Sequence, residues 1–185
     1  VGGDTTAGPL NICITVLGEV PPGRALLRGG ACPGDELWVS GVMGDARLAL
    51  ETFRGQLALG GDDFAHVRQA MEQPQPRVAL GQALRGLATS AIDLSDGLVG
   101  DLGHVLQRSG VGARVLLEQL PRSPVLARQS ATVQHQCLLA GGDDYELLFT
   151  APAAAHADVL QAGDQRVGHL EQHRTARQVQ PRVRI

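Results

Sequence analysis

The sequence has 185 residues, a formal net charge of −3 and 43% hydrophobic residues, as expected for a soluble globular chain of one domain or slightly more. The slight acidic excess argues against a general nucleic-acid binder, and no run of about 18 apolar residues exists that could span a membrane. All 16 basic residues are arginine, which excludes a Schiff-base lysine and a P-loop lysine.

Strands and helices alternate irregularly along the chain. Apolar and β-branched patterns predict strands at residues 10–20, 36–41, 90–94, 112–118, 145–151 and 166–171, with a further one at 177–185. Helical spacing predicts helices at residues 45–57, 62–73, 77–88 and 152–161, another from residue 98 onward, and a short one within 121–129. Because helices gather between residues 45 and 88, the pattern favours an α+β domain of layered sheet and helices over a doubly wound sheet.

The cysteines and the start of the chain bear on the compartment. Cys13, Cys32 and Cys137 form no C-x-x-C pair, and their odd number predicts buried thiols in a reducing environment. No charged-then-apolar signal sequence opens the chain, so we predict a cytoplasmic location. No G-x-S-x-G elbow, Walker A motif or G-x-G-x-x-G motif is present, which leaves hydrolase and P-loop interpretations without support.

Four acidic clusters flanked by glycine are the candidates for chemistry. They are GGDTT at residues 2–6, GGDD at 60–63, IDLSDGL at 92–98 and GGDDYEL at 141–147. Glycine lets a backbone approach a ligand closely, and carboxylates at such turns suit Mg²⁺, which takes one or two carboxylates together with water and phosphate oxygens. These clusters therefore suggest a site that handles phosphates through metal ions.

Each cluster also has a structural interpretation. Asp96 precedes Gly97 and a helix, so it could be a helix N-cap, and Ser95 is a second capping candidate. Residues 60–63 lie between two predicted helices and are best explained as a helix end and a helix start, with Asp62 or Asp63 as the cap. The cluster at 141–147 could be only a tight turn into a strand. Asp93 resists such an explanation, because a carboxylate at the end of an apolar strand costs stability unless a partner compensates it.

The combination of motifs is more specific than any one of them. GGDTT.GPL, P.GRAL.R.GA.PGD, AIDLSDGL..DL and GGDDYEL.F follow one another in the order and with the gaps of the thiamine-monophosphate kinases, which the chain resembles over residues 1–150. This family lies within the superfamily of aminoimidazole ribonucleotide synthetase. The resemblance implies ATP-dependent phosphorylation of thiamine monophosphate to thiamine diphosphate, with several Mg²⁺ ions held by acidic residues and no catalytic general base.

The resemblance assigns three residues of the first half of the chain to the nucleotide. The aspartate of GGD, Asp4, is expected to bind metal and to lie beside ATP, with Gly3 next to it. The arginine of AL.R.G, Arg28, is expected to contact ATP.

Four further assignments follow from the resemblance in the second half. Asp93 and Asp96 are expected to be metal ligands, and Ser95 is expected to touch ATP. Asp143 is expected to contact the thiamine substrate, at a position where many relatives carry glutamate.

The resemblance also implies how the chain is organised. We interpret residues 1–8 as the end of a junction with an N-terminal domain that binds ATP and Mg²⁺, and residues 9–185 as a C-terminal α+β domain that is truncated at its end. We expect a homodimer with small-molecule substrates, no nucleic-acid or membrane partner, and no activity from this piece alone. The alternatives are another ATP-using member of the superfamily and a nucleotide-binding or dimerisation module without turnover.

Overall fold

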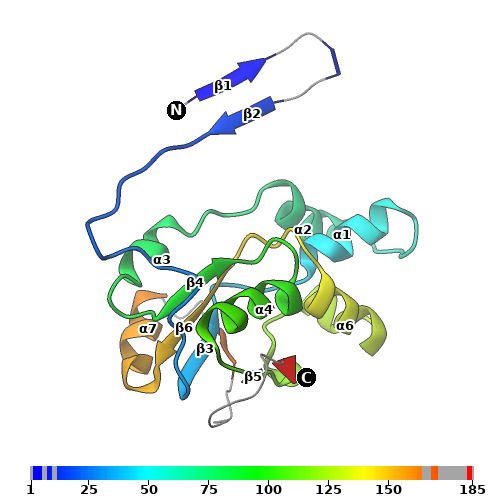
Figure 1. Cartoon of the computed structure of the whole chain (residues 1–185). Helices are drawn as coiled ribbons and strands as arrows, with labels where there is room; N and C mark the ends of the chain where they lie inside the picture. The colour runs from blue at the N-terminus through cyan, green and yellow to red at the C-terminus, as the bar shows by residue number, and fades with distance from the viewer. Residues whose placement is uncertain (1, 6–7, 10–11, 164–167, 171–182, 185) are drawn as a thin grey trace.

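The computed structural model describes residues 2–5, 8–9, 12–163, 168–170 and 183–184, and its centre is a four-stranded antiparallel sheet (Figure 1). The strands are β3 (Asp35–Val39), β4 (Ser90–Asp93), β6 (Leu147–Pro152) and β7 (Gly168–Leu170), in the spatial order β4-β6-β3-β7. Side chains alternate between the two faces. Leu37, Val39 and Leu148 belong to the larger core, whereas Trp38 and Phe149 belong to a smaller core on the other face.

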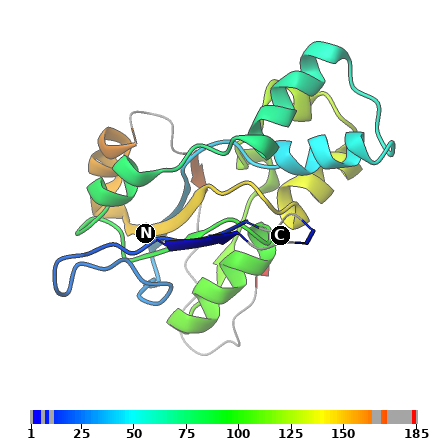
Figure 2. The ribbon, with the colours of Figure 1, turned by 90° about the horizontal axis from the view of Figure 1, so that it is seen from above.

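Helices cover both faces of this sheet. The larger core lies under α4 (Leu98–Ser109), α1 (Asp45–Phe53), α5 (Pro124–Ala127), α6 (Ala131–Ala140) and the short η1 (Leu117–Gln119). The smaller core lies under α3 (Val78–Ala83) and η2–α7 (Ala153–Ala155 and His156–Ala162). Figure 2 shows the sheet between α4 on one side and α3 with α7 on the other. The predicted α+β layered architecture is confirmed.

Helix α2 (Gly61–Glu72) packs on α1 and adds the fully buried Val67 to the larger core. The rings of Phe53 and Phe64 meet edge to face at a centroid distance of 5.0 Å. The predicted helix start between residues 60 and 63 is confirmed, but its predicted cap is wrong. Gly60 is the N-cap and no side chain caps this helix. Asp62 and Asp63 place negative charge in its first turn, and Asp63 also pairs with Arg128 at 2.7 Å.

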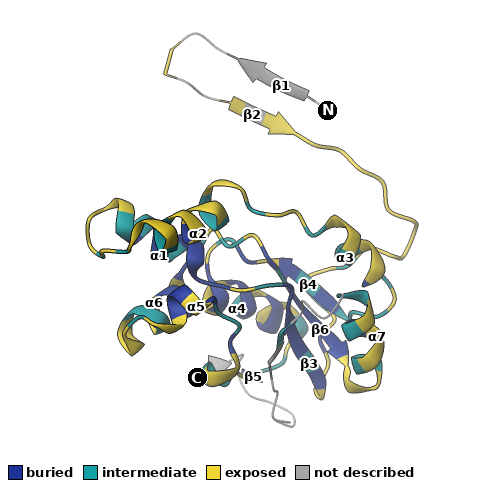
Figure 3. Ribbon diagram, turned by 180° about the vertical axis from the view of Figure 1, so that it is seen from behind, coloured by how far each residue is buried: buried dark blue, intermediate teal, exposed yellow. Residues whose placement is uncertain are grey.

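A hairpin of β1 (Gly2–Thr5) and β2 (Ile12–Thr15) stands apart from the sheet and helices (Figure 1). Ile12 and Ile14 are 67% and 68% exposed. Figure 3 colours β2 as exposed, whereas the strands of the central sheet are largely buried. The proposed junction at residues 1–8 ends within the turn of this hairpin, and it stays a prediction. A separate parallel pair joins β5 (Ala113–Arg114) to β8 (Val183–Arg184).

Several predicted elements are shorter than expected, and strand β1 and helix α6 are missing from the prediction. The strand expected at residues 10–20 covers only 12–15, the helix at 77–88 ends at Ala83, and the strand at 112–118 keeps two residues. Helix α6 was not predicted, because its apolar residues follow no single stripe. Its N-cap was a usable signal, since the Ser130 hydroxyl accepts a hydrogen bond from the Val133 N–H at 3.4 Å.

The cysteine prediction is partly wrong. Cys137 is buried as expected, but Cys32 is an exposed thiol. The side chain of Cys13 lies outside the described part of the chain. None of the described helices is both long and apolar enough to cross a membrane.

The packing of α4 on the sheet yields a direct test of the core. Leu102 is fully buried in the larger core, so Leu102→Ala should lower the free energy of unfolding by about 2–5 kcal/mol through lost burial and a cavity. His104→Ala, on the exposed face of the same helix, should change it by less than about 0.5 kcal/mol. Chemical denaturation of both variants checks this, and equal effects would contradict the packing.

Candidate functional site

Three chain segments meet at one end of the sheet, where β3 and β4 end and β6 begins. Backbone bonds join them: Ser40 N–H donates to Leu147 O at 3.0 Å, and Leu94 N–H donates to Glu146 O at 2.8 Å. The segments are residues 40–44, 94–97 and 141–146. Antiparallel pairing of β4 with β6 brings the second and third together, although about fifty residues separate them in sequence. The IDLSDGL and GGDDYEL clusters therefore form one surface.

Asp101 shapes the turn at residues 94–97. One oxygen of its carboxylate accepts three consecutive backbone N–H groups, from Ser95, Asp96 and Gly97, at 3.0, 3.0 and 3.1 Å. Asp101 is only 2% exposed, so it acts as a built-in anion that fills a nest of amides. The alternative of a side-chain cap by Asp96 or Ser95 is thereby corrected, because Gly97 is the N-cap of α4 and no side chain caps it.

The turn at residues 141–146 is held in an unusual conformation against the first turn. Asp143 N–H donates to Ser95 O at 2.9 Å and Tyr145 N–H donates to Leu94 O at 2.8 Å. Asp143 and Tyr145 have φ angles of 67° and 49°, in the left-handed region that non-glycine residues rarely adopt. Gly142 must lack a side chain, since a Cβ there would lie 2.5 Å from Ser95 O. The turn is thus more than a simple entry into β6.

Glu146 anchors the third segment from inside. It is buried, accepts a hydrogen bond from the Ser40 hydroxyl, and pairs with Arg77, whose Nε lies 2.7 Å from its Oε2. This bonding to Glu146 raises the pKa of Arg77. Gly41 is required beside it, because a side chain there would collide with the Glu146 carboxylate. A buried carboxylate with such partners is compensated, so it positions backbone rather than binding a ligand.

Asp144 points inward and ties the same turn to α1. Gly44 N–H, at the start of α1, donates to its two carboxylate oxygens at 2.9 and 3.1 Å. Burial raises the pKa of Asp144 to about 8, against the lowering effect of the Gly44 bond, and Asp45 and Glu146 raise it further. Burial also raises the pKa of Asp45, which accepts a hydrogen bond from the Ser123 hydroxyl at 2.6 Å.

Three carboxylates face outward from this framework. Asp93, Asp96 and Asp143 are exposed, and Ser95 is half-buried between them in the chain. The Tyr145 phenol donates to Asp143 Oδ1 at 3.1 Å. The pKa of Tyr145 is raised by that bond first, then by the charge of Asp143, and also by the charges of Asp93 and Asp96. Four of the residues assigned by resemblance, which are Asp93, Ser95, Asp96 and Asp143, are therefore brought together.

The other assigned residues lie elsewhere. Arg28 is exposed on a segment that runs beside β4, where Leu27 O accepts the Ala91 N–H at 2.9 Å. Gly3 and Asp4 lie in β1 of the hairpin that stands apart, with Asp4 paired to Cys13. Within the described residues no contact joins these three to the acidic turns.

The acidic turns offer the type of ligand atom that Mg²⁺ prefers, but no more than two carboxylates for one ion. Exposed carboxylates with no cysteine or histidine among them are the hard oxygen ligands that Mg²⁺ prefers. No group of three or more acidic, histidine or cysteine side chains converges as a metal site in the part of the chain that the structure describes. Asp93 and Asp96 fit the usual Mg²⁺ arrangement, in which one or two carboxylates are completed by water and phosphate oxygens.

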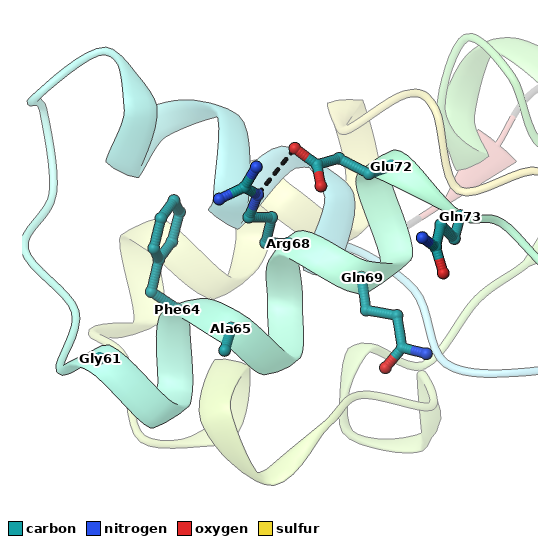
Figure 4. Close-up of a pocket in the computed structure, with 7 residues that line it drawn as sticks. All are labelled: Gly61, Phe64, Ala65, Arg68, Gln69, Glu72 and Gln73. Carbon is teal, nitrogen blue, oxygen red and sulfur yellow. Dashed lines mark hydrogen bonds and ion pairs between the residues drawn. The ribbon is translucent and has the colours of Figure 1, made fainter.

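A groove elsewhere on the surface is unrelated to these turns. It follows the outer side of α2 and is lined by Gly61, Phe64, Ala65, Arg68, Gln69, Glu72 and Gln73 (Figure 4). Two of these lining residues form an ion pair, with Arg68 Nε 2.7 Å from Glu72 Oε1. None of the residues of the three segments takes part in it.

Comparison with known proteins identifies the fold family. The family model described as AIR synthase related protein, C-terminal domain, matches residues 32–168. The chain belongs to this family.

The relatives are thiamine-monophosphate kinases, as the motifs predicted. The one from Salmonella typhimurium is 46% identical over 154 residues, which cover 82% of this chain and 47% of that protein. The crystal structure of thiamine-monophosphate kinase from Stenotrophomonas maltophilia superposes with a TM-score of 0.78 at 38% identity, covering 89% of this chain and 54% of that one. A structure described as AaThiL complexed with AMPPCP and TMP gives a TM-score of 0.68 at 30% identity, with coverage of 85% and 50%. This chain of the AIR synthase related family spans about half the length of these relatives.

The role of Asp101 can be tested through stability. Asp101→Ala leaves three amide donors without their acceptor and should lower the free energy of unfolding by about 3 kcal/mol. Asp62→Ala, an exposed aspartate in the first turn of α2, removes the same charge and should cost less than about 1 kcal/mol. Urea unfolding of both variants measures the difference, and equal losses would contradict the structural role of the amide nest.

The raised pKa of Asp144 predicts a pH dependence of stability. Its folded pKa of about 8 lies above the ordinary value of 3.8, so between these values the folded chain holds a proton that the unfolded chain releases. The stabilisation that Asp144 contributes to the free energy of unfolding is therefore fully present below about pH 4. It is lost as the pH rises to about 8, by at most about 1.4 kcal/mol per pH unit.

Asp144→Asn stays uncharged and its amide oxygen can still accept the Gly44 N–H, so this variant should flatten that decline. Burial also raises the pKa of Asp45, so Asp45 accounts for the pH dependence of stability that remains in this variant. Melting temperatures measured from pH 4 to pH 9 compare the two proteins. A decline that is as steep in the variant as in the unchanged chain would contradict the assignment to Asp144.

Proposed function

We propose that this chain is the C-terminal part of a thiamine-monophosphate kinase, which transfers the γ-phosphoryl group of ATP to thiamine monophosphate and forms thiamine diphosphate. One observation carries the proposal. The structure joins the two acidic turns that the family motifs single out, by bonds between Ser95 O and Asp143 N and between Leu94 O and Tyr145 N. The AaThiL complex with AMPPCP, an analogue of ATP, and with TMP supports a nucleotide and a phosphorylated acceptor as the two substrates.

Asp93 and Asp96 hold Mg²⁺ in this proposal, and Ser95 contacts ATP. Mg²⁺ would supply charge neutralisation between the phosphates of the two substrates. The two carboxylates suit this role because they are exposed, whereas Asp101 is buried and already accepts three amide N–H groups from the turn. Asp143, on the neighbouring turn, contacts the acceptor.

The chemistry requires little of the protein beyond positioning. The acceptor oxygen belongs to a phosphate group whose second pKa is near 6, so it is largely ionised at neutral pH and needs no general base. The obstacle is repulsion between polyanions, since two unit charges about 4 Å apart repel by about 4 kcal/mol at an effective dielectric constant of about 20. A metal-binding acidic surface with no catalytic base is consistent with that requirement.

Gly3, Asp4 and Arg28 remain assigned to ATP, with Asp4 also a metal ligand. Arg28 is exposed and therefore free to reach a nucleotide. The hairpin that carries Asp4 exposes apolar side chains such as Ile12 and Ile14, which suits an element that packs against further protein. A homodimer and a cytoplasmic location complete the proposal as predictions.

The proposal is tested by assaying thiamine diphosphate formation from thiamine monophosphate, ATP and Mg²⁺ with the complete protein. Product that depends on both Mg²⁺ and thiamine monophosphate is expected, and aminoimidazole-pathway substrates run in parallel should give none. A folded protein that binds ATP but forms no thiamine diphosphate would overturn the kinase assignment.

The same assay tests the metal ligands. Asp96→Asn removes one carboxylate charge but keeps the shape of the turn, so activity should fall by at least about 100-fold while the melting temperature changes little. Asp62→Asn, at an exposed position on α2, is the matched control and should keep full activity. Partial recovery of Asp96→Asn activity at raised Mg²⁺ would identify the loss as one of metal binding. Full activity of Asp96→Asn without raised Mg²⁺ would contradict the role of Asp96 as a metal ligand.

A further inference from the structure

Tyr145 keeps a left-handed backbone although its side chain gains little burial in return. Its φ is 49° and the residue is 47% exposed. Asparagine or glycine adopts this conformation at low cost, whereas a bulky aromatic residue does not. Folding alone therefore gives no reason for tyrosine here. Backbone strain of this kind persists where the surrounding structure imposes it and is found most often at ligand sites.

The surrounding structure does impose it. Tyr145 N–H is bonded to Leu94 O, and the residues on either side are fixed as well, Asp144 by Gly44 and Glu146 by Arg77. Because Asp144 and Glu146 turn inward, Tyr145 between them is turned outward. The ring is thus presented on a rigid support at the edge of the acidic surface.

The phenol of Tyr145 lies within the field of the acidic residues. It donates to Asp143 Oδ1 at 3.1 Å, and the charges of Asp93 and Asp96 also act on it. Apolar side chains are also exposed in the segment 40–44, where Val42 is 45% exposed, and in the first turn of α4, where Val99 is 37% exposed. Negative charge thus lies beside an aromatic face and exposed apolar surface.

We propose that Tyr145 is a specificity residue that packs its ring against the positively charged organic ring of the acceptor, with Asp143 supplying the opposite charge. This inference rests on the proposed function, in which the acceptor carries a thiazolium ring. A quaternary ring nitrogen has no N–H to donate, so a carboxylate cannot hold it through a hydrogen bond. An aromatic face binds such a cation through the ring quadrupole. Hydrated Mg²⁺, by contrast, is held by oxygen ligands and needs no aromatic ring.

The decisive variant is Tyr145→Asn in the complete protein. Asparagine relieves the backbone strain but removes the ring. The KM for thiamine monophosphate should rise about tenfold while the KM for ATP stays unchanged. The melting temperature should stay the same or rise by about 2 °C, which a merely structural tyrosine would not allow.

Two comparisons separate the ring from the hydroxyl and from charge. Tyr145→Phe keeps the ring and loses only the bond to Asp143, so its KM for thiamine monophosphate should remain within about threefold of the unchanged protein. An acceptor with a neutral thiophene in place of the thiazolium should bind the unchanged protein more weakly than thiamine monophosphate. That preference should shrink in Tyr145→Asn.

The outcomes are distinguishable. An unchanged KM in Tyr145→Asn, an equal rise for both substrates, or a fall in melting temperature shared by Tyr145→Asn and Tyr145→Phe would overturn the proposal. So would equal binding of the charged and neutral acceptors by the unchanged protein. Absence of thiamine diphosphate formation by the unchanged protein would instead overturn the proposed function, and this inference with it.

Discussion

The candidate site depends on one interaction, the carboxylate of Asp101 bonded to three successive amides of the IDLSDG turn. Without an internal anion, those amides would point into a buried space with no acceptor, and the turn would have to open toward water. With it, the chain reverses sharply between β4 and α4, so Asp93 and Asp96 project outward on either side of Ser95. The second turn is then built on the first, because its backbone bonds go to the carbonyls of Leu94 and Ser95. Disturbing Asp101 would therefore disturb both turns.

Acidic residues gathered at this end of the sheet repel one another and lose hydration where they are buried. The structure lowers this electrostatic cost differently for each buried carboxylate. Glu146 is paired with Arg77 and the Ser40 hydroxyl, so it is compensated where it is buried. Asp144 has no ion-pair partner among the described residues, and burial raises its pKa to about 8, which disfavours its charged form. Only the carboxylates that face solvent remain to attract cations. The inward acids thus position the turns, whereas the outward acids are exposed where a ligand could reach them.

The sequence predicts the family better than it predicts the local structure. IDLSDGL and GGDDYEL were recognisable because glycine and aspartate at fixed spacing carry the family resemblance, and β4 was recognisable because SAIDL is a short apolar strand. That the two turns bond to each other could not be deduced, because it depends on the antiparallel pairing of β4 and β6 across the sheet. The positioning residues were missed for the same reason. Arg77 lies 69 residues from Glu146 in the chain, and nothing in its neighbourhood marks it as the partner of a buried carboxylate. Asp101 was visible, four residues after Gly97 in the quoted motif, yet its inward direction became apparent only once α4 was placed.

The hairpin and the acidic turns differ in how far the layered domain fixes their positions. Asp93, Asp96 and Asp143 are preorganised by contacts that lie wholly within the layered domain, so this domain can present them without help. Asp4 is carried by a hairpin that stands apart from this domain, so contacts within the layered domain do not orient it toward the turns. In the proposed kinase, this division would let carboxylates from separate elements close around the phosphates after both substrates have entered. The rigidity of the two turns and the separateness of the hairpin are then complementary parts of one arrangement.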